Sequence, residues 1–392
     1  MPATSAATRS LRFTIVSTQR GWNGGENQAS LLAHGLRRRG HDCRIVARDR
    51  GQFAERMERA GFPTTRFPGR GLNPKGLRIL RGHLAEFAPD VLFSNDSHSL
   101  TSSGIASLGR RPPVRVAARR VDFLVRSPWQ YRAFADRVIC ISRSVYQACL
   151  QSGLTEPQLR LIYSGVDPRR VGAGNRPRGR AALGLKPTDQ LILCVGSLAE
   201  CKGQRYLLEA LASVARKHPR ATLALAGEGK LREVLELAAR ELDISERVQF
   251  LGYRTDVPDL LHACDLFVLP SIAEGLGTSV IDAMLCRRPI VTTTSGGIPE
   301  LVGPLPQGPA TAWLAAPGDH LALAEAIDEA LSDAEKSRRF VEQSEQRAHA
   351  MFTSDRMVEE TLALAYELLA AGSPTRQANL PTQPQQHSKT AA

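Results

Sequence analysis

The chain has 392 residues, only 5% of them aromatic, and no uninterrupted apolar run of the roughly 18 residues that a membrane-spanning helix needs. Residues 1–10, MPATSAATRS, lack the apolar segment of a secretory signal peptide. The seven cysteines are scattered without a C-x-x-C pair, and no His, Cys and Asp cluster has the spacing of metal ligands. These absences argue against a membrane-spanning protein, a disulfide-bonded secreted domain and a metal site, and they predict reduced thiols in a cytosolic protein.

Positive charge is concentrated in the first part of the chain. Residues 1–170 contain 28 Lys and Arg against 12 Asp and Glu, a balance of +16, whereas residues 171–392 contain 23 against 27, a balance of −4; the sum is +12. A basic region of this kind implies an anionic partner such as nucleic acid, anionic lipid headgroups or a phosphorylated glycan. The alternative is an arginine-rich surface without such a partner.

Strand-like and helix-like segments alternate along the chain. Residues 11–17 predict a strand, residues 28–39 an amphipathic helix and residues 43–47 a second strand, and the pattern starts afresh with a strand at residues 191–195. This alternation predicts the α/β class with parallel sheets. The length is enough for two large units of this kind.

The strongest functional pattern is residues 266–302, LFVLPSIAEGLGTSVIDAMLCRRPIVTTTSGGIPELV. A buried strand ends at Pro270, and a glycine loop leads from it to a helix that begins near Thr278. Glycines let backbone N–H groups approach an anion and a helix N-terminus carries partial positive charge, so the loop predicts a phosphate site. Glu274 and Asp282 bracket this site, and carboxylates accept hydrogen bonds from sugar hydroxyls. The pattern predicts an extended ligand with a central diphosphate; the alternative is that both acids are solvated surface positions.

This motif, E-G-L-G-T-S-x-x-D-A-M followed by G-G-I-P-E, resembles the donor site of retaining glycosyltransferase family 4, whose members have the two-domain GT-B fold. The resemblance implies that Glu274 contacts the donor sugar and that Asp282 holds the nucleotide ribose. The family has Glu at the second position, so the shorter Asp282 predicts a longer or water-mediated contact. The further donor-binding residues that the resemblance implies are Gly24, Gly25, Ser197, Lys202, Arg254, Gly275, Leu276, Gly277, Thr278 and Ser279.

Two other loops resemble the family's phosphate-binding loops. Lys202 stands where the family has a lysine on the donor diphosphate, whereas Ser197 stands where an arginine is frequent. A neutral hydroxyl is a weaker phosphate partner than a guanidinium. The first loop, residues 21–27, resembles the one that lies over the donor phosphates. Its glycines do not follow G-x-G-x-x-G, which argues against a dehydrogenase.

The acceptor side of the resemblance is less complete. Residues 89–94 predict another strand, and many family members carry His-x-His after it, with the second His near the reacting sugar. In this chain Asn95 stands at that position, and His98 follows three residues later. Either is a candidate partner of the acceptor hydroxyl, and a purely structural role for His98 stays open. With Glu274 and Lys202, these two residues complete the candidate catalytic set. The motif R-R-V-D-F adds the acceptor-side candidates Arg119, Arg120 and Asp122.

The resemblance covers residues 11–371 and predicts a GT-B protein of two Rossmann-like domains that face a central cleft. The predicted parts are a disordered leader (1–10), a first, acceptor-side domain (11–167), a linker (168–185), a second, nucleotide-sugar-binding domain (186–350), a C-terminal helix that packs back on the first domain (351–372) and a disordered tail (373–392).

The function implied is that of a retaining, metal-independent hexosyltransferase that moves a sugar from a UDP- or GDP-linked donor to a glycan or lipid-linked acceptor in lipopolysaccharide-like, cell-envelope biosynthesis. No cofactor and no nucleic-acid partner are expected. The basic first domain predicts a cytoplasmic protein that is peripheral on the anionic inner face of the cytoplasmic membrane. The alternatives are a nucleotide-sugar 2-epimerase of the same fold, for which the extra acids are not found, and an inactive nucleotide-sugar-binding module.

Overall fold

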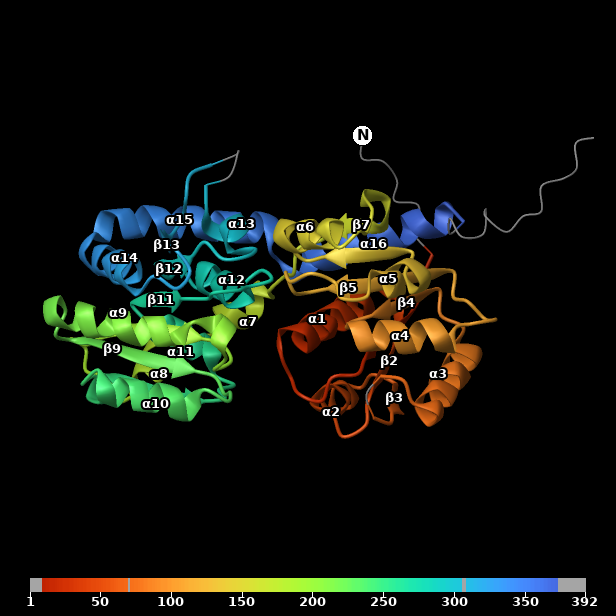
Figure 1. Cartoon of the computed structure of the whole chain (residues 1–392), viewed down its shortest axis with the longest axis horizontal. Coiled ribbons are helices and arrows are strands. Elements are labelled where there is room, and N and C mark those ends of the chain that lie inside the picture. The colour runs from red at the N-terminus through yellow and green to blue at the C-terminus, as the bar shows by residue number, and fades with distance from the viewer. Residues whose placement is uncertain (1–8, 70, 305–307, 373–392) are drawn as a thin grey trace, which may run out of the picture.

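The computed structural model describes residues 9–69, 71–304 and 308–372, which form two α/β domains beside each other (Figure 1). All strands of the seven-stranded first sheet and of the six-stranded second sheet pair in parallel. This confirms the predicted α/β class with two Rossmann-like units. The predicted tail at 373–392, and the predicted leader except for residues 9 and 10, lie outside the described residues.

The first domain has the strand order β3-β2-β1-β4-β5-β6-β7. Its strands are β1 (Arg12–Ser17), β2 (Asp42–Arg48), β3 (Thr64–Phe67), β4 (Val91–Ser94), β5 (Val114–Arg119), β6 (Arg137–Cys140) and β7 (Leu159–Leu161). Its helices are α1 (Gly24–Arg38), α2 (Gln52–Arg59), α3 (Pro74–Phe87), α4 (Ser97–Ala106), α5 (Pro128–Phe134), α6 (Arg143–Gln151) and the 3-10 helix η1 (Glu156–Gln158). Helices cover both faces of a sheet of this kind, which is why its central strands β1, β4 and β5 are buried along almost their whole length.

The second domain has the strand order β10-β9-β8-β11-β12-β13. Its strands are β8 (Gln190–Val195), β9 (Ala221–Ala226), β10 (Val248–Gly252), β11 (Leu266–Leu269), β12 (Ile290–Thr293) and β13 (Trp313–Ala315). The helices from the crossover onward are α7 (Pro168–Gly172), α8 (Arg176–Ala182), η2 (Glu200–Lys202), α9 (Gln204–Lys217), α10 (Arg232–Glu241), η3 (Ser245–Arg247), α11 (Val257–Ala263), α12 (Thr278–Leu285), α13 (Ile298–Val302), α14 (His320–Ser332), α15 (Ala334–Met351) and α16 (Ser354–Ala370).

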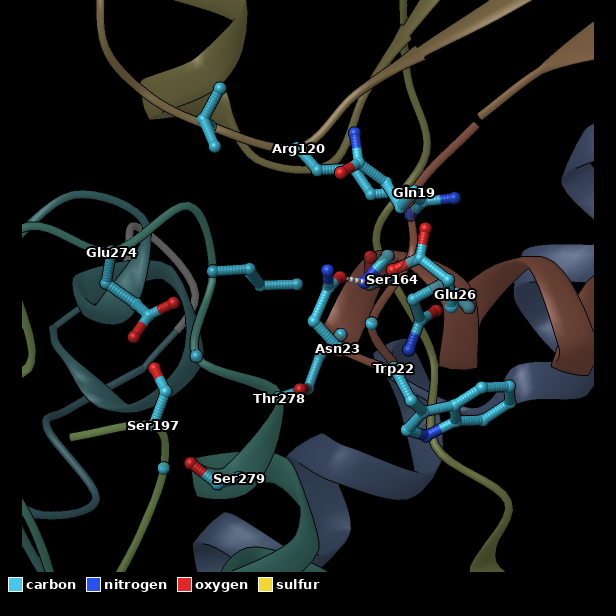
Figure 2. A pocket seen from close by; sticks show the side chains of 18 of the residues that line it. Gln19, Trp22, Asn23, Glu26, Arg120, Ser164, Ser197, Glu274, Thr278 and Ser279 are labelled. Carbon is cyan, nitrogen blue, oxygen red and sulfur yellow. Dashed lines mark hydrogen bonds between the residues drawn. The ribbon is translucent and has the colours of Figure 1, made fainter. Parts of the chain in front are cut away.

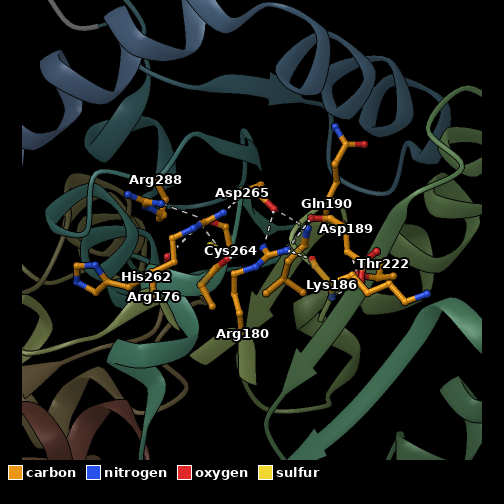
Figure 3. Close-up of polar contacts among 12 residues, drawn as sticks. Arg176, Arg180, Lys186, Asp189, Gln190, Thr222, His262, Cys264, Asp265 and Arg288 are labelled. Atoms are coloured by element: carbon orange, nitrogen blue, oxygen red, sulfur yellow. Dashed lines mark hydrogen bonds and ion pairs between the residues drawn. The ribbon is translucent and has the colours of Figure 1, made fainter. Parts of the chain in front are cut away.

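The segment predicted as a linker, residues 168–185, is folded onto the second domain. Its helix α8 packs against α11, and Arg176 pairs with Asp265 at 2.7 Å (Figure 3). Arg180 reaches the same carboxylate at 3.4 Å, and Asp265 also accepts a hydrogen bond from the Leu191 N–H at the start of β8. The arginines that suggested an open linker therefore dock this segment, and the second structural unit begins near residue 168.

The last helix, α16, crosses back to the first domain and packs on α1. Its Val358 and Leu362 belong to the same buried apolar cluster as the first-domain strands. Gly35 makes the close approach possible, because a Cβ there would lie 2.4 Å from a methyl group of Val358. The chain passes between the domains twice, near residue 167 and near residue 353. Backbone hydrogen bonds join the two passages, from the Val166 N–H to the Phe352 carbonyl at 2.9 Å and from the Ser354 N–H to the Val166 carbonyl at 2.8 Å.

Helix α1 begins four residues earlier than the sequence pattern predicts. Asn23 caps it by accepting a hydrogen bond from the Gly25 N–H at 2.9 Å, so Gly24 and Gly25 form its first turn. The glycine loop of the prediction is therefore partly a helix N-terminus.

The cysteines are all unpaired, and every one except Cys201 is buried. Across the described ranges, no helix is long and apolar enough to cross a bilayer.

Candidate active site

A cleft of about 1130 Å³ lies between the two domains. It is lined by the loops that follow β1, β4 and β5 of the first sheet and β8, β9, β10 and β11 of the second. These are the carboxyl ends of parallel strands, where ligands bind in open α/β sheets. Figure 2 shows Glu274, Ser197 and Ser279 on one side of the cleft and Asn23, Glu26 and Gln19 on the other.

On the second-domain side, Lys202 and Glu274 form an ion pair. Both side chains are largely buried, and Ser271 donates a second hydrogen bond to the same carboxylate oxygen at 3.2 Å. The loops that carry the pair are joined by the hydrogen bond from the Ile272 N–H to the Cys201 carbonyl at 2.8 Å. Glu274 is therefore a positioned cleft residue rather than a solvated surface acid.

Helix α12 presents its N-terminus to the same cleft. Gly277 precedes it with a φ of 91°, a conformation that favours glycine, and Thr278 and Ser279 line the cleft at its first turn. The free N–H groups of a helix N-terminus attract anions, so this end and Lys202 form a cationic wall suited to phosphate groups.

Gly275 and Asp122 do not line the cleft but lie where the two domains touch. A Cβ at Gly275 would lie 2.3 Å from the carbonyl oxygen of Arg120, and a Cβ at Gly296 would lie 2.7 Å from a carboxylate oxygen of Asp122. The sequence pattern explained the loop glycines by close approach to a phosphate. At Gly275 the close approach is to the backbone of the other domain.

Asp282 lines the cleft about one turn into α12 and forms an ion pair with Arg170 at 2.6 Å. Burial raises the pKa of Asp282 to about 6, and the charge of Arg170 opposes that rise. Arg254, on the loop after β10, lines the same side and pairs with Asp256 at the end of its own loop. Ser197 lines the cleft beside these charged groups.

On the first-domain side, Asn95 is buried at the centre of a polar network. Its amide nitrogen donates to the Gly25 carbonyl at 3.2 Å and to Glu26 at 3.4 Å, and its amide oxygen accepts from Arg120 at 2.9 Å. Ser17 donates to the same oxygen of Glu26 at 2.9 Å. Burial raises the pKa of Glu26, and burial lowers the pKa of Arg120 to about 10.

His98 is absent from the cleft lining and faces Gly71 instead, where a Cβ would lie 3.7 Å from its ring nitrogen. Of the two acceptor-side alternatives, the cleft therefore contains Asn95. Arg119 lines the cleft but is largely buried, and it donates to the Phe123 carbonyl at 2.6 Å. Arg120 and the first-turn glycines Gly24 and Gly25 line it as well, as does Leu276 of the donor loop.

Sequence reasoning missed several cleft residues. Glu26 directly follows the two glycines of α1, and its position in a first helical turn was the available signal. Tyr253 comes from the second domain and accepts a hydrogen bond from Arg56 of the first at 2.8 Å, while the same guanidinium lies 4.2 Å over the ring of Trp22. This contact bridges the mouth of the cleft and has no sequence signal, because its members are far apart in the chain.

No group of three or more His, Cys, Asp and Glu side chains in residues 9–69, 71–304 and 308–372 is arranged to hold a metal ion.

Known proteins match the chain along most of its length. Residues 22–170 match a family model described as Glycosyltransferase Family 4, and residues 175–347 match one described as Glycosyl transferases group 1. The N-acetyl-alpha-D-glucosaminyl L-malate synthase of Bacillus anthracis is 25% identical over 236 residues, which are 60% of each chain. An uncharacterized glycosyltransferase of Methanocaldococcus jannaschii is 27% identical over 233 residues, 58% of each chain. The match thus spans about three fifths of the length of these relatives.

Solved structures with the same architecture cover both domains. The Anabaena protein HepE in complex with UDP-glucose is 25% identical with a TM-score of 0.79, over 92% of this chain and 100% of that one. Sucrose-phosphate synthase from Thermosynechococcus elongatus, at 20% identity and a TM-score of 0.76 over 93% and 100% of the two chains, shares the fold. The two family models match consecutive segments, one over the first domain and one over the second. The chain therefore belongs to the family 4 glycosyltransferases of GT-B fold.

Proposed function

We propose that the protein is a retaining glycosyltransferase that uses a nucleotide-diphosphate sugar. The observation that carries the proposal is the Lys202–Glu274 pair, which lies in the interdomain cleft with the N-terminus of α12. Lys202 and the helix N-terminus would stabilise the departing diphosphate, and Glu274 would hold the sugar. The relative bound to UDP-glucose favours a uridine nucleotide as the donor.

In this mechanism the protein supplies position and charge, and forms no covalent bond to the sugar. The bond between the anomeric carbon and the donor phosphate breaks, and the departing phosphate takes the proton of the acceptor hydroxyl. The hydroxyl oxygen bonds to the anomeric carbon on the face that the phosphate leaves, so the configuration is retained. Asn95 and Arg120 line the first-domain wall, where they would orient the acceptor hydroxyl. Because Lys202 already offers positive charge, activity should survive excess chelator; loss that magnesium or manganese restores would contradict this mechanism.

The test is a panel of nucleotide sugars, scored for slow hydrolysis and for a thermal shift. The expected result is stabilisation by one nucleotide class together with slow release of its sugar. If the protein binds a nucleotide sugar but does not turn it over, even when an extract that contains acceptors is added, the result would favour an inactive nucleotide-sugar-binding module. Sugar inversion at its second carbon would favour an epimerase.

The acceptor proposed is an anionic or lipid-linked glycan, of the lipopolysaccharide or another cell-envelope type, met at the cytoplasmic face of a membrane. Several arginines of the basic first domain are engaged by other groups of the protein: Arg38 and Arg39 pair with acids of α16, and Arg66 pairs with Glu58 and Asp49. Arg37 stacks on Phe62. Arg70 lies outside the described residues.

A better membrane-facing surface is the flank formed by α3, α4 and α5, which pack in that order. Phe123, Leu124 and Trp129 are 61%, 58% and 56% exposed there. The exposed cations on the same flank for which the described chain gives no side-chain partner are Lys75, Arg78, Arg81, Arg110 and Arg126. Each basic residue near an anionic surface contributes about 1 kcal/mol, and aromatic side chains favour the membrane interface.

Co-sedimentation with vesicles tests this surface. Replacing Lys75, Arg78 and Arg81 by Ser should abolish binding to anionic vesicles, whereas replacing the exposed second-domain cations Arg216, Lys230 and Arg240 lowers the net charge equally and should not. Equal binding to neutral vesicles, or equal loss in both triple variants, would contradict it.

A further inference from the structure

Asp282 is bound to a residue that lies outside every motif of the family resemblance. Arg170 approaches its carboxylate to 2.6 Å from helix α7, 112 positions earlier in the chain. The carboxylate side chain is only 13% exposed, whereas that of Arg170 is 44% exposed. One buried acid of the cleft is thus held from the solvent side by a partly exposed guanidinium.

Arg170 has a fixed place because α7 is anchored on the second domain. The next residue, Val171, is buried, and its carbonyl accepts a hydrogen bond from His262 of α11 at 3.1 Å. Helix α8, which follows, is held by the Arg176 and Arg180 contacts to Asp265 (Figure 3). Arg170 is therefore fixed to the same domain as Asp282, although in the sequence it lies between the two domains.

We propose that Arg170 is a positioning residue of the nucleotide site, holding Asp282 in place so that this short carboxylate can accept hydrogen bonds from the ribose hydroxyls of a nucleoside diphosphate. The inference rests on the proposed function and deepens it. A glutamate at this position would reach the ribose with one more methylene. Here the shorter acid is fixed by a bond from the crossover helix instead, which lowers the conformational entropy it loses when the ligand binds.

The electrostatic surroundings make the contact sensitive to pH. Burial raises the pKa of Asp282 to about 6 and Arg170 opposes the rise, so removal of Arg170 should raise that pKa further. A protonated carboxyl loses acceptor capacity, so ribose binding should weaken as the pH falls through the pKa of Asp282.

Other titratable groups near Asp282 are few. On its own helix, Cys286 follows one turn later, and burial raises the pKa of that thiol to about 12, so it stays neutral. On the neighbouring helix α15, Glu345 pairs with Arg287 at 2.5 Å, and His262 of α11 bonds to the Val171 carbonyl of α7. Strands β11 and β12, which also pack on α12, carry no charged residue.

The experiment is isothermal titration with UDP from pH 5.5 to 8.5. The parent should lose affinity below about pH 6. Arg170→Ala should move the midpoint of this loss to higher pH and bind about tenfold more weakly at pH 7, as a midpoint one unit above that pH would give. The difference in UDP affinity between Arg170→Ala and the parent should narrow at pH 8.5. Arg170→Lys should regain most of the affinity that Arg170→Ala loses. Asp282→Asn should bind weakly without this pH dependence.

Arg169→Ala is the matched control, because Arg169 lies on the same helix but pairs with Asp167 at 3.0 Å; it should follow the parent profile. Circular dichroism at each pH confirms that the variants are folded. An Arg170→Ala profile that coincides with that of the parent, or a loss of the same size at every pH, overturns the inference while UDP binding by the parent upholds the nucleotide site. If the parent binds no nucleoside diphosphate at any pH, the proposed function fails, and the inference fails with it.

Discussion

The two walls of the cleft are built in different ways. The second-domain wall contains two separate ion pairs whose acids line the cleft, Lys202 with Glu274 and Arg170 with Asp282. The first-domain wall is a buried network in which Asn95 joins Glu26 to Arg120. An acid that lines the cleft can exchange its partner for a ligand or for water at little cost to the fold, whereas a buried network cannot lose a member without leaving a polar group unsatisfied. Changes in the two walls should therefore separate activity from stability.

The largest effect is expected from Glu274→Ala, which breaks the second-domain wall. Transfer activity should fall by about 10²–10³-fold, because the group that orients the donor sugar is lost. Free UDP should still bind, and the melting temperature should change little. Turnover assays and isothermal titration measure the two properties. Glu200→Ala is the control, an exposed acid two residues before Lys202; near-normal turnover in Glu274→Ala would remove Glu274 from the site.

Breaking the first-domain wall should act on the fold instead. Asn95→Leu leaves Glu26 and Arg120 without their shared partner, and the free energy of unfolding should fall by about 2–4 kcal/mol. Activity should fall as well, because Arg120 loses its orientation. Urea unfolding at pH 7 measures the change, with the exposed neighbour Ser97→Ala as the reference. A stability equal to that of the parent would mean that the network contributes nothing to folding.

The next largest effect is expected from a substitution at the contact between the two walls. A Cβ at Gly275 would meet the backbone oxygen of Arg120, which cannot rotate away, so Gly275→Ala should hold the domains apart and lower turnover about tenfold. In the parent, a bound donor should make the molecule more compact in small-angle scattering. The variant should stay more open than the parent, whereas Gly172→Ala should not, since nothing lies within 4 Å of its added Cβ. Equal scattering profiles for parent and variant would exclude this role of Gly275.

The smallest effect should come from the mouth of the cleft. Arg56→Ala removes an exposed hydrogen bond to Tyr253, worth about 0.5–1.5 kcal/mol, together with the contact over the Trp22 ring, so UDP affinity should change by only a few fold. The fluorescence of Trp22 should change on UDP addition in the parent, and less in this variant, because the guanidinium over its ring is gone. Arg59→Ala, on the same helix, pairs with Glu55 and serves as the control. Identical fluorescence responses would show that the contact does not follow domain closure.

The difference between the walls also decides what sequence reasoning could reach. The residues of the donor loop, Glu274 to Ser279, are contiguous, so one motif implied both the fold and half of the cleft. Arg170, which holds the nearby Asp282, comes instead from a segment whose composition suggested a linker. On the other wall, the sequence left Asn95 and His98 as alternatives. Only the turn at the end of β4, which directs Asn95 inward and places His98 on α4 toward Gly71, separates them.

The double crossing between the domains limits how this chain can be recombined with its relatives. A chimera cut after residue 167 would inherit this protein's α1 but a foreign last helix. That helix would have to fit Gly35, where the native Val358 leaves no room for even one added methyl group. Exchange of donor specificity by grafting should therefore succeed only when the graft ends before residue 352, so that α16 stays with the helix on which it packs.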